Sequence, residues 1–263
     1  MESQNQDIKK RVRVVSLLPN VVNHESAINA IAELVERGDG GCVCFSTVHM
    51  VMEGYDNAEY GTKVNNADLI ITDGMPLVWM QKLQGATTAS RVRGSDLMIS
   101  LCEFAEKNDL SVGFYGGRQE VIDKIIKRAA KQLPKLKIAY AFSPPFRVLT
   151  AEEDVNIVRE INEKSPDILL IGLGCPKQEN WMWAHKDKLK TVMLGVGAAF
   201  DFYAGNVKES PEWMGNLGLE WLFRLVQEPK RLWKRYLILN PRFIWLATLQ
   251  LSGLRNFEES RKN

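Results

Sequence analysis

The sequence lacks the features that mark a metal site, a disulfide-rich fold or a membrane-spanning chain. Its four cysteines fit neither a zinc-binding spacing nor a disulfide framework, so we expect reduced core thiols at Cys42, Cys44, Cys102 and Cys175. The three histidines lie far apart and include no H-E-x-x-H pattern, which argues against a zinc site. No stretch reaches the ~20 uninterrupted apolar residues of a spanning helix. The N-terminal region has no long apolar run, and we expect no signal peptide there.

An excess of charge of one sign is also absent. The 34 Lys and Arg residues against 32 Asp and Glu give a net charge of +2, so any basic surface must be local. The chain contains no G-x-G-x-x-G, G-x-x-x-x-G-K-[ST] or G-x-S-x-G motif. Dinucleotide binding, Walker-type NTP hydrolysis and acyl hydrolysis are therefore unsupported. The chain also has no Asp-x-Asp pair to hold Mg²⁺.

Short apolar runs alternate with segments of helical period, as expected for a parallel sheet covered by helices on both faces. The expected strands are Val12–Leu18, Cys42–Ser46, Ala67–Thr72, Ser111–Tyr115, Lys137–Ala141, Asp167–Gly172 and Thr191–Val196. The expected helices are Glu25–Arg37, Val48–Glu53, Ser95–Lys107, Glu120–Leu133, Ala151–Lys164 and Gln178–His185. Ser95 or Asp96 is placed to cap the third helix.

Ligands of such sheets bind beyond the carboxyl ends of the strands, so the residues that follow each strand are the candidates. Asp73 follows an apolar strand and could take a proton from a hydroxyl nucleophile, or it could form an Asx-turn with Gly74. Thr47 and His49 follow the preceding strand, although a lone histidine is often structural. Glycines that end other strands, including Gly172 and Gly174, mark further candidate positions.

Two other segments could bind phosphate or sugar. Arg91 and Arg93 precede a helix, where arginine donors and free N–H groups suit phosphate, although they could also be a solvated pair. The segment 172–180 resembles a phosphate-cradling turn, and its Gln178 could hold a sugar or a base.

After about residue 205 the strand pattern stops. We therefore divide the chain into an α/β core at residues 1–205 and a helical appendage at residues 206–263. The appendage carries a cluster of basic residues interleaved with tryptophans: Arg224, Lys230, Arg231, Lys234, Arg235 and Arg242. Such a segment could bind an anionic membrane surface, clamp a diphosphate, or close its own core.

Together these segments resemble the bacterial WecG/TagA/CpsF glycosyltransferases, from about residue 14 to residue 240. The most specific motifs are ADLIITDG, RVRGSDL, GLGCPKQENW, GVGAAFDFYAGNVKESPEWM and GLEWLFRLVQEPKRLWKRY. The resemblance implies a Rossmann-like core with a C-terminal helical appendage that closes over a nucleotide. It also implies a cytoplasmic enzyme, peripheral on the inner face of the membrane. Such an enzyme transfers a sugar from a UDP-sugar to a polyprenyl-diphosphate-linked saccharide, with inversion and without a metal or cofactor.

The resemblance also implies roles for individual residues. Asp73 would be the general base, and Arg91 would neutralise charge on the leaving diphosphate. Thr47, Gln178 and Asp201 would line the sugar and acceptor pocket, with His49, Gly172 and Gly174 nearby. The UDP phosphates would be held by Arg224, Arg231 and Arg235. Two departures from the expected motifs, at Val48-His49 and at Glu209-Ser210, bear on the polar pattern of the pocket and on acceptor contacts.

Other interpretations remain open at this point. The chain could be a non-catalytic nucleotide- or lipid-binding module at the membrane. A nucleic-acid binder is disfavoured by the near-neutral charge. The donated sugar could be N-acetylmannosamine, glucose or galactose. The oligomeric state is open too, with a homo-oligomer among the options.

Overall fold

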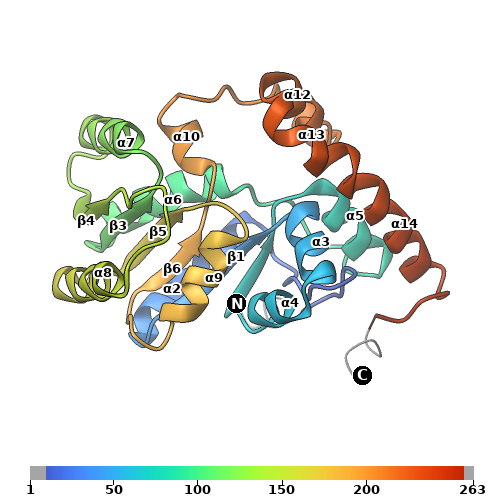
Figure 1. Ribbon diagram of the computed structural model, residues 1–263, viewed down its shortest axis with the longest axis horizontal. Coiled ribbons are helices and arrows are strands. Elements are labelled where there is room, and N and C mark those ends of the chain that lie inside the picture. Colours follow the sequence, from blue (N-terminus) through green and yellow to red (C-terminus); the bar gives the residue numbers. More distant parts are fainter. Residues whose placement is uncertain (1–9, 258–263) are drawn as a thin grey trace.

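The chain forms a single parallel β-sheet with helices on both faces (Figure 1). The structure is a computed structural model that describes residues 10–257, apart from the side chains at positions 212 and 216. The strands are β1 (Gly41–Ser46), β2 (Leu69–Thr72), β3 (Ser111–Gly116), β4 (Lys137–Phe142), β5 (Ile168–Gly172) and β6 (Val192–Gly195). Their order is β2-β1-β6-β5-β3-β4, and every pairing is parallel. This confirms the predicted α/β, Rossmann-like class.

The helices divide between the two faces of the sheet. Those of the core are α2 (His24–Arg37), α3 (Val48–Asp56), α4 (Ala58–Asn65), α5 (Met75–Leu83), α6 (Gly94–Lys107), α7 (Gln119–Gln132), α8 (Ala151–Lys164), α9 (Lys177–His185) and α10 (Ala199–Tyr203). Side chains alternate along each strand. Val43 and Phe45 thus pack with α2 and α6, whereas Cys42 and Cys44 pack with α3 and α4. The continuous apolar strands of the sequence reflect this two-sided burial.

The first predicted strand, Val12–Leu18, is wrong. The segment makes only two isolated bridges, Arg11 with Asn20 and Val14 with Leu17, because the chain reverses at Val15, where φ is 54°. Val14, Val15 and Leu17 are nevertheless fully buried. The apolar run in the sequence therefore reflects burial of this segment beneath the helices, and it does not indicate a β-strand. The other predicted strands are confirmed within a few residues, and α4, α5 and α10 are additions to the predicted pattern.

The predicted cap of α6 is also wrong. The helix begins at Gly94, and its N-cap position is held by Arg93, not by Ser95 or Asp96. The Gly94 N–H instead donates to Asp73 Oδ2 at 3.3 Å. The cap is supplied by a residue that lies 21 positions earlier in the chain. A local motif such as a capping box cannot reveal such a partner.

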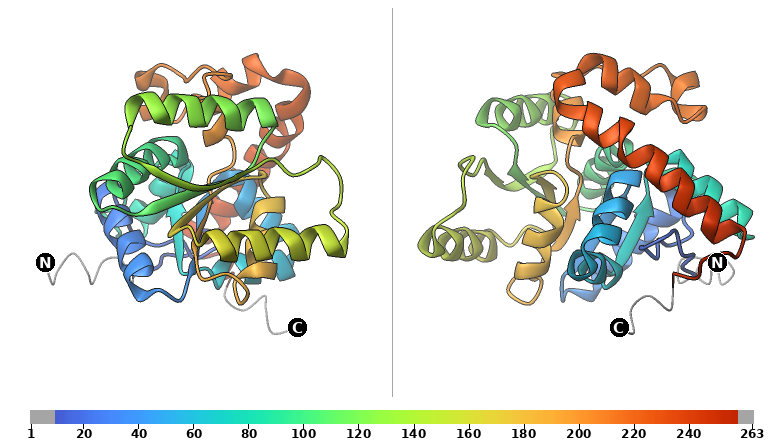
Figure 2. Two further views of the ribbon diagram at one scale, coloured as in Figure 1. Left: turned by 90° about the vertical axis from the view of Figure 1, so that its left-hand side faces the viewer. Right: turned by 45° about the vertical axis from the view of Figure 1, so that its right-hand side comes forward.

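The C-terminal helices lie over the carboxyl edge of the sheet and then descend along its side (Figures 1 and 2). They are α11 (Glu212–Asn216), α12 (Glu220–Gln227), α13 (Pro229–Leu237) and α14 (Leu239–Leu251). Phe243 and Leu246 of α14 join the buried cluster beneath α3 and α4. None of the helices within residues 10–257 combines the length and apolarity that crossing a bilayer requires. The division at residue 205 stays a prediction, and its outer ends, residues 1–9 and 258–263, lie outside the described residues.

One glycine of the predicted site is required by packing. A Cβ atom on Gly172 would lie 2.5 Å from Cδ2 of Phe200. The Phe200 ring is buried and meets Phe114 edge-on with ring centroids 5.9 Å apart, so it has little room to move. Gly172 therefore lets α10 approach the end of β5, where the site lies.

We expect Gly172→Ala to lower the free energy of unfolding by about 1–3 kcal/mol, the usual cost of overpacking a core. Gly41→Ala is the matched control. It is also a strand glycine, but its Cβ would come no closer than 3.4 Å to any atom, with Leu34 Cδ1 at 3.4 Å and Asp68 Oδ2 at 3.5 Å. Urea unfolding of both variants measures the difference. Equal losses would show that the approach of Phe200 does not require a glycine.

Candidate active site

Three adjoining cavities open at the carboxyl edge of the sheet, beneath the C-terminal helices. Their volumes are about 130, 190 and 590 Å³, and Arg224 lines all three. Every residue predicted for the site lines at least one of them: Thr47, His49, Asp73, Arg91, Gly172, Gly174, Gln178, Asp201, Arg224, Arg231 and Arg235. The fold thus gathers residues that are far apart in the sequence, and their individual roles stay predictions.

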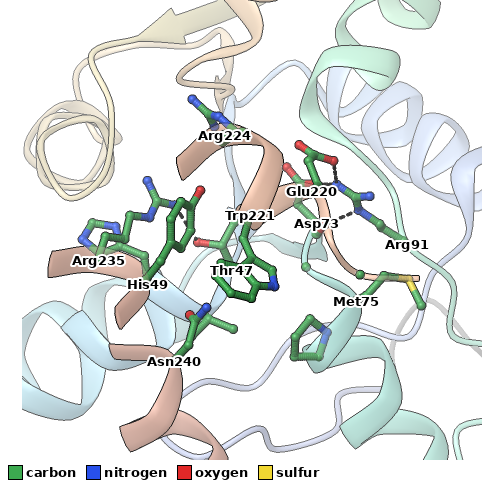
Figure 3. A pocket seen from close by; sticks show the side chains of 15 residues that line it. Thr47, His49, Asp73, Met75, Arg91, Glu220, Trp221, Arg224, Arg235 and Asn240 are labelled. Carbon is green, nitrogen blue, oxygen red and sulfur yellow. Dashed lines mark hydrogen bonds and ion pairs between the residues drawn. The ribbon is translucent and has the colours of Figure 1, made fainter. Parts of the chain in front are cut away.

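Asp73 lies at the end of β2, on one side of the smallest cavity (Figure 3). Its backbone N–H donates to the Ser46 carbonyl at the end of β1, and its Oδ2 accepts the Gly94 N–H at the start of α6. Burial raises the pKa of Asp73, the charge of Arg91 opposes that rise, and the charge of Glu220 adds to it. A carboxylate with a raised pKa at a cavity is suited to act as a base near neutral pH.

Arg91 is bound to both the core and the appendage. Its Nε donates to the Asp73 carbonyl at 2.6 Å, and its Nη2 lies 2.5 Å from Glu220 Oε2 and 3.5 Å from Asp73 Oδ1. Only 15% of the side chain is exposed, so Arg91 is not the solvated arginine that the sequence also allowed. Through these contacts Arg91 holds both the main chain and the carboxylate of Asp73 in place.

Arg235 and Arg224 reach the cavities from the appendage. Within the described residues no carboxylate pairs with Arg235, whose Nη2 lies 3.5 Å from Thr47 Oγ1. The Nε atoms of Arg235 and Arg224 are buried without a hydrogen-bond partner among these residues. Arg224 and Arg231 both contact Glu228. Buried guanidinium groups with unused donors are suited to an anionic ligand with several oxygen atoms, such as a diphosphate.

His49 lies on the Arg235 side of the cavity and is neutral. Burial, and then the charge of Arg235, lower its pKa to about 4. Its Nε2 lies 3.2 Å from Glu53 Oε1, so the neutral ring can donate from Nε2. Nδ1 is buried and has no partner among the described residues. Nδ1 is then an acceptor that a ligand hydroxyl group could use.

Gln178 connects two loops of the site. Its Nε2 donates to the Gly195 carbonyl at 2.6 Å and to Glu179 Oε1 at 2.8 Å, and its Oε1 accepts the Gly174 N–H at 3.0 Å. Both N–H donors of the amide are thus used within the protein. For the predicted contact with a sugar, Gln178 has only one lone pair of Oε1 still available. Its hydrogen bonds instead hold the two loops that shape the cavity.

Asp201 lies in the short helix α10 and lines the largest cavity. Its Oδ1 accepts from Asn206 Nδ2 at 3.4 Å. This cavity extends to Phe146, whose side chain is 82% exposed. The room beside Asp201 and Arg231 is therefore open and partly aromatic, which is suited to the nucleoside portion of a ligand.

Several residues that line the site were not predicted from the sequence. Glu220, Trp221 and Asn240 line the cavity that contains Asp73 (Figure 3), and Tyr236 lines it too. Glu220 lies in the GLEW motif, four residues before the basic cluster begins at Arg224. A carboxylate in a basic segment was the available signal.

The described residues include no group of three or more His, Cys, Asp or Glu side chains that could hold a metal ion. The four cysteines are free, but Cys175 is only partly buried and lines the cavity of about 190 Å³, so the prediction of a core thiol is wrong for this residue. Cys42, Cys44 and Cys102 are buried, and burial raises the pKa of each thiol. They are therefore unreactive core side chains.

The sequence is similar to known proteins. A model of the glycosyl transferase WecG/TagA/CpsF family matches residues 12–256. A protein of Bacillus subtilis (strain 168) is 31% identical over 77% of this chain and 77% of its own length. A protein of Bacillus spizizenii is 29% identical over 80% of this chain and 79% of its own length. A third relative, from Staphylococcus aureus (strain MW2), is 29% identical over 64% of this chain and 65% of its own length. Each relative is named N-acetylglucosaminyldiphosphoundecaprenol N-acetyl-beta-D-mannosaminyltransferase.

We expect His49 to titrate near pH 4 in the folded protein, well below its ordinary value of 6.5. NMR of the ring resonances, assigned with the help of His49→Gln, measures the midpoint. The unfolded chain then binds more protons than the folded chain below about pH 6.5. This residue should therefore lower the stability as the pH falls from about 6.5 towards about 4. A midpoint above about pH 6 would contradict the neutral ring.

Proposed function

The chain belongs to the WecG/TagA/CpsF family of glycosyl transferases, and we propose that it transfers a sugar from a UDP-sugar to a saccharide on a polyprenyl diphosphate lipid. The transfer inverts the anomeric configuration and uses neither a divalent metal nor a cofactor. One observation carries the proposal: Asp73 and the arginines Arg224 and Arg235 line the same cavity (Figure 3). A base and a cationic site for a leaving diphosphate are therefore within reach of one sugar.

The chemistry is a single displacement. The acceptor hydroxyl oxygen attacks the anomeric carbon of the sugar while Asp73 takes the hydroxyl proton. The bond from that carbon to the diphosphate oxygen breaks, and UDP leaves with the electron pair. General base assistance contributes about 10²–10⁴-fold to such a step. The Arg224, Arg231 and Arg235 guanidinium groups would balance the charge that develops on UDP, as a metal ion does in other transferases.

The names of the relatives favour particular substrates. These proteins transfer N-acetylmannosamine to N-acetylglucosaminyl diphosphoundecaprenol. We propose the same donor sugar and the same acceptor class for this chain. UDP-glucose and UDP-galactose are the competing donors for a direct comparison. The cavity of about 590 Å³ beside Asp201 would take the nucleoside, because it adjoins Arg224 and Arg231.

We further propose that the enzyme is cytoplasmic and that residues 206–263 close the site and contact the inner face of the membrane. In the described part of this segment, the apolar side chains of Trp233, Leu237 and Trp245 are exposed, and so are the basic side chains of Lys230 and Lys234. Each basic residue near an anionic surface contributes on the order of 1 kcal/mol. Because α14 also packs into the core, point substitutions test this role better than deletion of the segment.

Asp73→Asn should lower kcat at least ~100-fold and leave UDP binding intact, because the amide cannot accept the proton. Initial rates with UDP-N-acetylmannosamine and a short-chain lipid diphosphate acceptor measure kcat, and calorimetry measures UDP binding. Asp39→Asn, an exposed carboxylate 66% accessible beside Arg37, is the control. Unchanged turnover in Asp73→Asn would reject the base. UDP binding with no turnover in the wild type would favour the non-catalytic module.

Arg235→Gln should weaken UDP binding about 10- to 100-fold, the value of a charge-assisted hydrogen bond of about 1.5–3 kcal/mol. Arg159→Gln, an exposed arginine on α8 that pairs with Glu163, is the matched control and should bind UDP normally.

EDTA should leave wild-type turnover unchanged if arginines balance the charge. Inhibition by EDTA that Mg²⁺ reverses would contradict the metal-free mechanism.

A further inference from the structure

Glu220 is a partly buried carboxylate that the chemistry above does not use. It is the first residue of α12, and only 18% of its side chain is exposed. Its Oε2 lies 2.5 Å from Arg91 Nη2 and 3.7 Å from Arg93 Nε. Exposed ion pairs contribute little to a fold, but this carboxylate lies between two arginines that are themselves mostly buried. Such an arrangement requires a structural or functional explanation.

The contacts of Arg91 connect Glu220 to Asp73 (Figure 3). Nη2 of Arg91 lies 2.5 Å from Glu220 but 3.5 Å from Asp73 Oδ1, so Glu220 has the closer contact. Nε of the same guanidinium group donates to the Asp73 carbonyl. Arg91 thus fixes the main chain of Asp73 firmly while it pairs only loosely with its carboxylate.

We propose that Glu220 is a positioning residue for the transfer reaction: it holds Arg91 on the main chain of Asp73 and thereby keeps the Asp73 carboxylate available as the base. The proposal rests on the proposed function. Glu220 also ties the start of α12 to the core, and α12 carries Arg224 into the same cavity. One carboxylate would then set the geometry of both the base and the cationic site.

Electrostatics act in the same direction. The negative charge of Glu220 raises the pKa of Asp73, whereas Arg91, the Gly94 N–H and Arg93 lower it, and burial raises it. The other titratable side chains around this cavity are the cationic Arg224 and Arg235, the neutral His49 and the phenol of Tyr236. Without Glu220, Arg91 would be free to pair fully with Asp73. A fully paired aspartate is a weaker base.

A competing role for Glu220 is that of a placeholder. Carboxylate and phosphate both match the guanidinium fork. Glu220 could therefore occupy on Arg91 the position of a ligand phosphate and be displaced when the substrate binds. The two roles predict opposite effects of removing the charge. A positioning residue supports turnover, whereas a placeholder opposes binding of the ligand.

The test is Glu220→Gln, which keeps the shape and removes the charge. We expect kcat to fall about 10- to 100-fold, corresponding to loss of a charge-assisted contact, with little change in the KM for the UDP-sugar. The acid limb of the pH–rate profile should move to lower pH, because Asp73 loses a neighbouring negative charge. Asp96→Asn is the matched control. Asp96 also pairs with Arg93, at 3.5 Å, but it is 46% exposed and does not line the three cavities.

Two further measurements separate the charge of Glu220 from its reach and test the pKa of Asp73 directly. Glu220→Asp retains the charge but not the reach, so it should lower kcat without moving the acid limb. NMR titration of the Asp73 carboxyl group in Glu220→Gln should show a lower midpoint than in the wild type, whether or not the protein is active. Failure of the wild type to transfer sugar would therefore overturn the proposed function alone.

Three results would overturn the role of Glu220. The first is an unchanged kcat and acid limb in folded Glu220→Gln. The second is tighter UDP binding with kcat retained, which would identify the placeholder. The third is an equal loss of kcat in Asp96→Asn, which would show that Arg93 and not Arg91 transmits the effect. If Glu220→Gln does not fold, Glu220→Asp and its pH profile decide the outcome.

Discussion

The role proposed for Asp73 requires a carboxylate that remains ionised and unpaired beside the arginines that we propose bind a diphosphate. The rest of the site can be understood from this requirement. Asp73 accepts one main-chain N–H from α6, and its carboxylate lies 3.5 Å from Arg91. Glu220 has the closer contact with that arginine. The second carboxylate limits the neutralisation of the first, and burial keeps both interactions stronger than they would be in water.

The topology of the sheet meets this requirement with residues that are distant in sequence. Parallel strands bring the ends of β1, β2, β5 and β6 to one edge, where Asp73 and the glycine turns lie. The appendage then returns over that edge and supplies Glu220 and the arginines. Because α14 packs through Phe243 into the core, the return path of the chain is fixed by burial and not by the ionic contacts alone.

The sequence predicted the sheet well because buried parallel strands are continuous apolar runs bounded by turns. The prediction of a strand at Val12–Leu18 was wrong for the same reason, since full burial of Val14 and Val15 produces the same apolar pattern without a strand. The sequence could indicate which residues line the cavities because each of them follows a strand or lies in a distinctive motif. Glu220 and the capping of α6 by Asp73 were missed. Both depend on contacts between segments far apart in the chain, which no local pattern encodes.

The distribution of carboxylate partners separates the arginines by role. Arg91, Arg224 and Arg231 each contact a glutamate, so their orientation is set before any ligand arrives. Arg235 has only the Thr47 hydroxyl within hydrogen-bond distance among described side chains, and its charge helps to keep His49 neutral. An arginine without a carboxylate partner contributes its full charge to a ligand. The neutral His49 ring can then accept a hydrogen bond from a ligand hydroxyl group, and it does not repel the positive charge of Arg235. The region around Arg235 is thus suited to bind substrate, and the region around Glu220 is suited to orient the base.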